Sequence, residues 1–164
     1  MIPKASDTQG KQDQGAKPLH PQELPVRLLL YYIGKARDAH ANAIAAEYIK
    51  RSTRFAKCEM REIQPKRFDP WTAHPATTKI LLDPAGRKFD SPAFISLVDK
   101  AERDGRDVVF ILGGADGLPA EWRPRADVLM ALSPLTMPHE LARALLAEQI
   151  YRAFTTLRGH PYPR

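Results

Sequence analysis

Short apolar runs that alternate with helical patterns constrain the fold of this chain more than any other feature. The runs lie at residues 26–33, 79–83, 107–112 and 126–132, with a weaker one at 55–63. Uninterrupted runs of this length are typical of strands that are buried on both faces. Apolar residues at helical spacing predict helices over residues 36–51, 91–104 and 138–156. Strands alternating with helices predict an α/β fold with a mainly parallel sheet covered on both faces.

Local signals refine these boundaries. Ser91 is expected to cap the helix over 91–104, with Pro92 at its first position and Gly105 ending it. Pro84-Ala85-Gly86 predicts a turn after the strand over 79–83, and the proline-containing residues 64–78 predict a loop. Trp71 and Trp122 are expected to be packing residues.

The N-terminal segment differs in composition from the rest of the chain. Residues 1–25 contain four prolines, four glutamines and two glycines, and their charges cancel. Such a segment cannot bury enough apolar surface to offset the entropy of ordering it. We therefore expect a flexible extension over residues 1–25 and one domain over 26–164, in keeping with about 150 residues per domain.

Composition excludes several classes of protein. The single cysteine, Cys58, cannot form an internal disulfide or a Cys-rich zinc site, and the histidines show no metal-ligand spacing. No apolar run approaches the roughly 18 residues of a membrane span, and the N-terminus lacks the apolar core of a secretory signal. A cytoplasmic protein without metal or membrane attachment is expected. The net charge of +6 permits a polyanionic partner.

Three segments are expected at the carboxyl ends of the strands, where open α/β sheets bind ligands. They are residues 82–86, 113–117 and 132–139. The glycines of Gly113-Gly114-Ala115-Asp116-Gly117 permit either close approach to a ligand or only a tight turn, and their spacing is not that of a dinucleotide fold. The loop over 132–139 is unusually apolar. It could hold an adenine-like ring through its backbone, or it could pack into the core or a dimer interface.

The C-terminal segment combines arginines with aromatic rings. Arg158, His160, Tyr162 and Arg164 suit RNA through phosphate pairing and base stacking, but a frayed basic tail has the same composition. Glu148 and Arg152 stand four residues apart, which is the spacing of an ordinary surface ion pair on a helix and permits a role in a site as well.

Taken together, these motifs resemble the RlmH family of the SPOUT superfamily, which methylates a pseudouridine of large-subunit (23S) ribosomal RNA. The resemblance covers residues 26–164. It is carried by Gly105-Arg106-Asp107-Val108, the glycine loop ending in Gly117-Leu118, the loop over 132–139, Arg143, residues 147–153 and His160-Pro161-Tyr162.

The resemblance implies a parallel-sheet α/β fold with a trefoil knot near the C-terminus, an exception to the rule against threaded chains. It implies binding of S-adenosylmethionine in a bent form by three loops. It further implies a homodimer whose active site is completed across an interface that the helix after Pro138 largely supplies. The implied cofactor-binding residues are Leu82, Gly113, Leu132, Ser133, Pro134, Leu135, Thr136 and Met137.

The implied reaction transfers the methyl group to N3 of the pseudouridine. By resemblance, His160 and Tyr162 would position the base or assist its proton, and Arg152 and Arg164 would face a phosphate or the developing anion. The implied RNA-binding residues are Arg143, Arg158 and Arg164, and the implied partner is ribosomal RNA or the ribosome.

The chain also departs from the family pattern. Pro163 occupies a position where the family usually has histidine, Ala115-Asp116 replaces Pro-Glu, and the segment between Lys66 and Lys79 is shorter. A non-catalytic ribosome- or RNA-binding domain that retains the fold therefore stays open as an alternative. So does a SPOUT enzyme with a different RNA target.

Overall fold

The computed structural model describes residues 25–162, so residues 1–24, Pro163 and Arg164 lie outside it. Three expectations therefore fall outside the described residues: the flexible extension over residues 1–25 (except Pro25), the replacement of the family's histidine by Pro163, and the role of Arg164. The strands are β1 (Arg27–Ile33), β2 (Lys57–Ile63), β3 (Thr78–Lys88), β4 (Val108–Leu112) and β5 (Val128–Ala131). The helices are α1 (Ala39–Ser52), α2 (Pro70–Ala73), α3 (Ser91–Asp104) and α4 (His139–Leu157), with a 3₁₀ helix, η2 (Ala120–Arg125).

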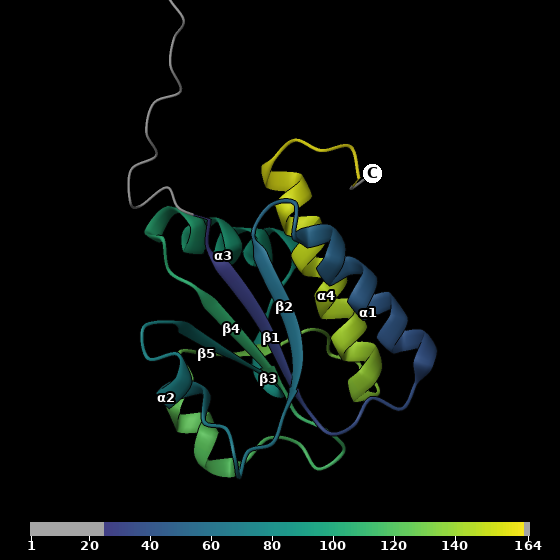
Figure 1. The fold of residues 1–164 in the computed structure, drawn as a ribbon, viewed down its shortest axis with the longest axis vertical. Helices are drawn as coiled ribbons and strands as arrows, with labels where there is room; N and C mark the ends of the chain where they lie inside the picture. The colour runs from purple at the N-terminus through teal and green to yellow at the C-terminus, as the bar shows by residue number, and fades with distance from the viewer. Residues whose placement is uncertain (1–24, 163–164) are drawn as a thin grey trace, which may run out of the picture.

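The sheet has the order β2-β1-β4-β3-β5 and all its strand pairs are parallel. This confirms the predicted α/β class. Figure 1 shows α1 and α4 lying side by side, with α3 near the amino ends of the strands. The carboxyl ends meet at the opposite edge, as parallel pairing requires.

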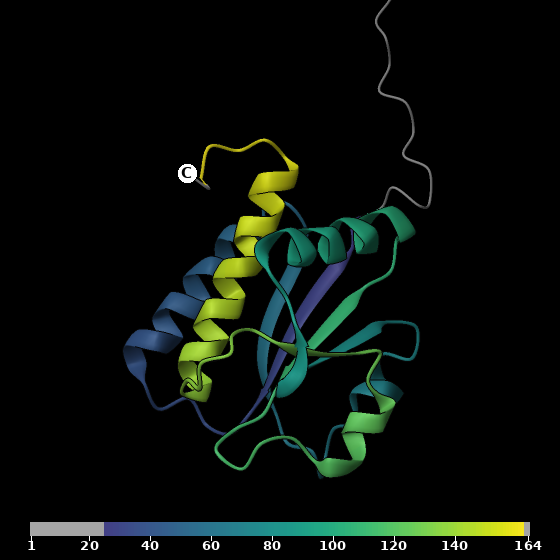
Figure 2. The same cartoon turned by 180° about the vertical axis from the view of Figure 1, so that it is seen from behind.

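Alternating side chains along the strands build a core on each face of the sheet. Leu28 and Leu30 of β1 pack with residues of α1, α3 and α4. Leu29 and Tyr31 point to the other face and pack with Trp122. The alternation follows from the two-residue period of a strand. In Figure 2, α3 and η2 are seen from behind at opposite edges of the sheet.

The cap of helix α3 lies one residue earlier than predicted. Asp90 is the N-cap, and its carboxylate accepts a hydrogen bond from the Ala93 N–H at 2.9 Å, so Ser91 is the first helical residue. Gly105 adopts φ +62° and ends the helix, as predicted. Helix α1 starts at Ala39 because Asp38 caps it by accepting from the Ala41 N–H.

Two local predictions were wrong. Residues 64–78 are not only a loop, because Asp69 caps the short helix α2 by accepting from the Trp71 N–H at 3.0 Å. The predicted turn at residues 84–86 is instead an irregularity within β3, which resumes pairing with β5 at Arg87. A Cβ on Gly86 would lie 2.7 Å from the Leu129 carbonyl carbon, so a glycine is required where the two strands approach.

Helix α4 connects the two ends of the molecule. It packs along α1 and buries Leu146, Ile150 and Phe154. Its first turn lies at the carboxyl edge of the sheet and its last turn at the opposite edge. Among residues 25–162, no helix has the length and apolar character needed to cross a membrane.

Candidate functional site

A cavity of about 270 Å³ opens at the carboxyl edge of the sheet. It is bounded by the end of β3, the glycine loop after β4, and the loop that joins β5 to α4. These are the three segments that the sequence placed at a ligand-binding edge. The structure thus brings together all eight expected cofactor residues: Leu82, Gly113, Leu132, Ser133, Pro134, Leu135, Thr136 and Met137.

The glycine loop is both a tight turn and a wall of this cavity. A Cβ on Gly113 would lie 2.5 Å from the Gly117 carbonyl carbon, and one on Gly114 would lie 2.7 Å from the Ile33 carbonyl oxygen. Gly117 adopts φ +76°, a conformation that side chains rarely take. The tight turn is therefore confirmed. Gly113, Gly114 and Gly117 also line the cavity, so close approach of their backbone to a ligand stays a prediction.

Leu132 of the apolar loop over residues 132–139 packs against the core, and residues 133–137 line the cavity. Leu135 is 78% exposed. Ser133 turns the loop, since its hydroxyl oxygen accepts a hydrogen bond from the Leu135 N–H at 2.9 Å. Leu135 is therefore available to contact a ligand in the cavity or another chain.

One polar corner of the cavity was not predicted. The Asp83 carboxylate, 5% exposed, pairs with the Arg123 guanidinium at 3.0 Å and accepts from the Ala85 N–H. Both side chains line the cavity. The signal for Asp83 was its place directly after a buried strand. Nothing in the sequence indicated Arg123, which η2 brings to the site.

The expected catalytic residues Tyr162 and Arg152 meet at a different place, around Glu148. The Glu148 carboxylate accepts from the Tyr162 hydroxyl at 2.9 Å and from the Arg152 guanidinium at 2.7 Å. The Tyr162 hydroxyl also lies 3.1 Å from that of Tyr48, and its ring contacts Tyr151 edge to face. We call Tyr48, Glu148, Tyr151, Arg152 and Tyr162 the tail cluster.

The tail cluster sets the protonation of Tyr162. Burial, followed by the hydrogen bonds with Tyr48 and Glu148, raises the pKa of the Tyr162 phenol above its usual value. His160 lies next to this cluster, and its Nδ1 accepts from the Tyr162 N–H at 3.1 Å. The ion pair of Glu148 with Arg152 was foreseen from its spacing. Tyr48, 114 residues from Tyr162, could not be found from the sequence.

Two of the expected RNA-binding arginines are engaged within the protein. Arg143 is 1% exposed, and its guanidinium lies 3.7 Å above the Tyr32 ring and donates to Asn42 and Glu140. Burial lowers the pKa of this guanidinium. The structure therefore places Arg143 away from any surface that RNA could reach, contrary to expectation. Arg158 remains at the surface, where it donates to the Glu102 carboxylate at 3.0 Å.

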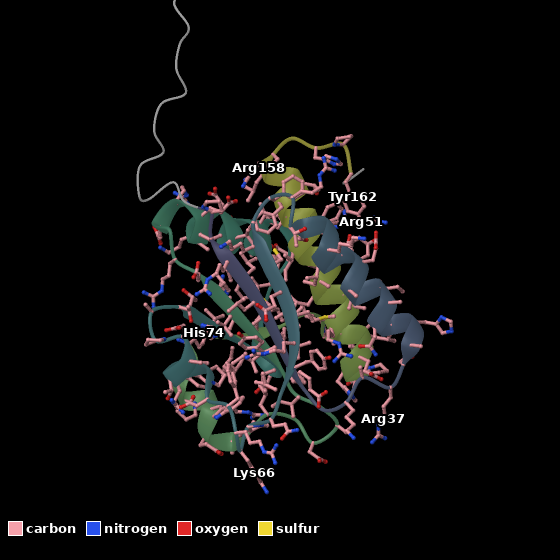
Figure 3. The ribbon with its side chains drawn as sticks, viewed as in Figure 1. Arg37, Arg51, Lys66, His74, Arg158 and Tyr162 are labelled. Carbon is pink, nitrogen blue, oxygen red and sulfur yellow. The ribbon has the colours of Figure 1, made fainter. Side chains whose placement is uncertain are left out.

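The cavity and the tail cluster lie apart. His139 and Ala142 line the cavity, whereas Arg152 stands ten residues further along α4, which corresponds to about 15 Å at the helical rise of about 1.5 Å per residue. Figure 3 shows Tyr162 and Arg158 at one end of the molecule and Arg37 and Lys66 at the other. Reacting atoms must approach to about 3–3.5 Å, so the two groups of one chain do not form one active site.

Sequence comparison shows which proteins this chain is similar to. The family described as "Predicted SPOUT methyltransferase" matches residues 26–163. A ribosomal RNA large subunit methyltransferase H of Solibacter usitatus is 59% identical over 139 residues, covering 85% of this chain and all of the relative. The protein of the same name from Sorangium cellulosum is 40% identical over 143 residues, covering 84% and 99%.

Structure comparison agrees on the fold. A crystal structure described as a probable methyltransferase of Bordetella pertussis superposes with a TM-score of 0.53 at 16% identity, covering 82% of this chain and 98% of its own. A probable methylase family protein of Haemophilus influenzae gives a TM-score of 0.51 at 10% identity, covering 85% and 70%. At such identities the likeness shows the fold alone.

The match over residues 26–163 and the close relatives together leave one conclusion: this chain belongs to the SPOUT methyltransferase family, among the ribosomal RNA large subunit methyltransferases H.

Proposed function

We propose that this chain transfers a methyl group from S-adenosylmethionine to N3 of a pseudouridine in large-subunit (23S) ribosomal RNA, acting as a homodimer. The observation that carries the proposal is the cavity at the carboxyl edge, whose lining includes every residue expected to bind the cofactor. The names of the relatives support ribosomal RNA as the substrate.

The cavity lining fits this cofactor chemically. Leu82, Leu132 and Met137 offer an apolar wall for a flat base, and the loop backbone offers hydrogen-bonding groups beside it. The neighbouring pair of Asp83 and Arg123 supplies one carboxylate and one guanidinium, which suit hydroxyl, amine or carboxylate groups of a ligand. The volume of about 270 Å³ is close to the roughly 300 Å³ lower end for small-ligand sites.

When bound, the cofactor supplies an activated methyl group on a positively charged sulfur. That methyl group would pass from the sulfur to N3 of the pseudouridine, and the N3 proton would pass to a general base. The residues of the chain must orient the acceptor and receive that proton. The raised pKa of Tyr162 keeps its phenol neutral, which suits it to orient the base by hydrogen bonding. His160 and Arg152 stay candidates for the proton and the anion.

A homodimer resolves the separation of cavity and tail cluster. If a second copy brings its tail cluster against the cavity of the first, cofactor and acceptor groups meet across the interface. Leu141 and Leu145 are 49% and 40% exposed on α4, on the same helical stripe as Glu148 and Arg152. An exposed apolar stripe that connects both groups supports an interface there. The expected knot in the C-terminal part of the chain belongs to the same proposal.

Methyl transfer to ribosomal RNA tests the proposal directly. Purified protein is incubated with S-adenosylmethionine labelled in its methyl group and with ribosomes or RNA from cells lacking the modification, and the labelled nucleoside is identified by mass spectrometry. We expect N3-methylpseudouridine from the large-subunit RNA and more label from ribosomes than from free RNA.

Other outcomes of this experiment would contradict the proposal. Label in another nucleoside would favour a SPOUT enzyme with a different target. Ribosome binding without label and without binding of S-adenosylmethionine would favour a non-catalytic RNA-binding domain. Ultracentrifugation of the same sample measures the dimer, and a monomer at working concentration would remove the shared site.

A further inference from the structure

A second groove lies at the carboxyl edge of the sheet, between the ends of β1 and β2. Its volume is about 360 Å³, and it is lined by apolar Ile33, Ile63 and Pro65. Lys35 and Lys66 line it from the two loops that follow these strands, and Glu62 contributes the one carboxylate in the lining.

Two further cations stand in the same loops. Arg37 lies two residues after Lys35, and Arg67 follows Lys66. All four residues are exposed, and none of their side chains forms an ion pair within residues 25–162. Figure 3 shows Arg37 and Lys66 at the same end of the molecule. We call Lys35, Arg37, Lys66 and Arg67 the basic rim.

The carboxylates near the basic rim balance its charge only in part. Asp38 caps α1. Asp69 caps α2 and pairs with Arg125 at 3.2 Å. Glu140 accepts from the backbone N–H groups of Arg37 at 2.6 Å and Asp38 at 3.1 Å. Arg125 and Arg143 balance the charges of Asp69 and Glu140, so Asp38 and Glu62 are left against the four cations and the rim keeps a net positive charge.

The same hydrogen bonds hold the rim in place. Glu140 is on α4, and through Arg37 and Asp38 it fixes the loop that carries Lys35 and Arg37. Gly34 turns this loop with φ +93°. The loop is therefore ordered before any ligand binds, and its cations lose less freedom on binding than those of a free tail would.

The groove also lies directly beside the cofactor cavity. Ile33 and Gly34 line the groove, Gly114 lines the cavity, and a Cβ on Gly114 would lie 2.7 Å from the Ile33 carbonyl oxygen. In the sheet order the gap between β1 and β2 is two strand spacings from the gap between β4 and β3, or about 10 Å. A polyanion held in the groove would therefore pass the mouth of the cavity.

From this arrangement we infer that the basic rim and its groove bind the phosphate backbone of single-stranded RNA next to the nucleotide that enters the cavity. The inference rests on the proposed function and names the surface that holds its substrate. Lysine and arginine side chains neutralise phosphates, and the apolar groove between them fits the sugar and base of a neighbouring nucleotide.

The experiment compares two double charge reversals in the full-length protein. K35E/K66E alters the rim, and K57E/K88E makes the same change in charge at exposed lysines outside both cavities and outside the ion pairs of the described residues. Affinity for large-subunit RNA lacking the methyl group is measured by filter binding across salt concentrations, affinity for S-adenosylmethionine by calorimetry, and methyl transfer by incorporation of label.

We expect K35E/K66E to weaken RNA binding about tenfold or more, and to reduce the slope of log affinity against log salt by about 1.4 for two lost phosphate contacts on a single strand. Affinity for S-adenosylmethionine stays unchanged, and KM for RNA rises while kcat at saturating RNA is kept. K57E/K88E makes the same change in net charge but removes no phosphate contact of the rim. It is therefore expected to change RNA affinity less than twofold.

An equal loss in both double variants, or no loss in K35E/K66E, overturns the inference. The binding measurement separates it from the proposed function. If the wild-type protein binds RNA through the rim but transfers no methyl group, the proposed activity fails and the rim stands. If methyl transfer occurs and K35E/K66E binds RNA normally, the rim fails and the activity stands.

Discussion

The two ends of helix α4 are built in different ways. At its first turn, the cofactor cavity is shaped by backbone that passes too close for side chains, as at Gly113 and Gly114. At its last turns, the tail cluster is held by hydrogen bonds between side chains that are distant in sequence, such as Tyr162 with Tyr48 and Glu148. Backbone contacts of this kind tolerate almost no change, whereas each side-chain hydrogen bond contributes only about 1 kcal/mol.

This difference suggests that the two ends of α4 have different roles in binding. A cavity walled by close backbone contacts suits a cofactor that is the same molecule in every turnover. A cluster made of individually weak bonds could rearrange when a nucleotide is placed against it, and in the proposed mechanism Tyr162 and Arg152 would exchange their bonds with Glu148 for bonds to RNA. Mutations at each end can show whether the two ends are separable and whether they differ in this way.

The strongest test mixes two defective proteins. Gly113→Ala damages the cavity and Arg152→Ala damages the tail cluster, so each variant alone is expected to have little methyl transfer. If cavity and cluster meet across a two-fold interface, half of the randomly formed dimers are mixed and one of their two sites is intact, which restores about a quarter of wild-type activity. Activity is measured after the variants are unfolded and refolded together.

Separate refolding of each variant, followed by mixing on ice, is the control for subunit exchange. No recovery after joint refolding, with mixed dimers demonstrated by mass spectrometry, would show that the cavity and cluster of the same chain act together.

The next prediction concerns the cavity alone. Gly113→Ala places a Cβ 2.5 Å from the Gly117 backbone, which cannot move without displacing the loop. Forced overpacking costs about 1–3 kcal/mol, so affinity for S-adenosylmethionine is expected to fall roughly tenfold to a hundredfold by calorimetry.

The matched control for this substitution is Gly159→Ala. Gly159 has φ +64°, but no atom lies within 4 Å of the position that a Cβ would take there, so only the conformational cost of about 1–2 kcal/mol applies. This variant is expected to be less stable and to bind S-adenosylmethionine normally. Equal loss of affinity in both variants would mean that the cavity does not depend on close backbone approach.

Much of this organisation followed from the sequence. Buried apolar runs specify parallel strands, and parallel strands place the segments after them at one edge, so the three loops of the cavity could be predicted together. The glycines were ambiguous by spacing, because a tight turn and a ligand loop have the same composition. The contact of Gly114 with Ile33 shows the tight turn, and the lining of the cavity shows only that the glycines lie where a ligand could approach them.

The features that could not be predicted depend on contacts between residues that are far apart in the sequence. The resemblance implied that Arg143 binds RNA, yet Arg143 is buried because Tyr32 of β1 and Asn42 of α1 contact it. Pro84-Ala85-Gly86 has the composition of a turn, but β5 pairs with the residues on both sides of it. Tyr48 joins the tail cluster only because α1 packs along α4. None of these partners can be identified from a local sequence pattern.

A smaller effect is expected in the tail cluster at alkaline pH. The pKa of Tyr162 is raised, mainly by burial and then by its hydrogen bonds with Tyr48 and Glu148, so the folded state keeps the phenol neutral. Stability from this cluster is complete below about pH 10, where a free tyrosine begins to ionise, and declines as the pH rises toward the folded pKa. Phenolate absorbance during titration should show one late component that Tyr162→Phe removes.

Tyr162→Phe also removes the hydroxyl that bonds with Tyr48 and Glu148. The hydrogen bond by which this hydroxyl is proposed to orient the acceptor base is lost with it. At about 1 kcal/mol for that bond, methyl transfer is expected to slow about fivefold without a change in affinity for S-adenosylmethionine. A late component that persists in Tyr162→Phe, or a change in cofactor affinity, would contradict the separation of cluster and cavity.

The smallest effect is expected at the cavity end in acid. Hydrogen bonds from the Arg37 backbone, the Asn42 side chain and the Asp38 backbone lower the pKa of Glu140 to about 2. Its contribution to stability is therefore complete above the ordinary glutamate value of 4.5 and is lost as the pH falls toward 2. The loop that carries Lys35 and Arg37 should loosen in that range, seen as faster amide hydrogen exchange of Arg37 and Asp38 relative to intrinsic rates.

Glu140→Gln is the control, because a neutral amide accepts weaker hydrogen bonds and does not titrate. Its exchange should be faster than that of the wild type at neutral pH and should show no further acid step. If the wild-type protein keeps full protection of Arg37 and Asp38 down to pH 2, Glu140 does not order this loop. Only the glycine contacts would then keep the cavity end rigid. The loop that carries Lys35 and Arg37 would be free to change conformation on binding, like the tail cluster.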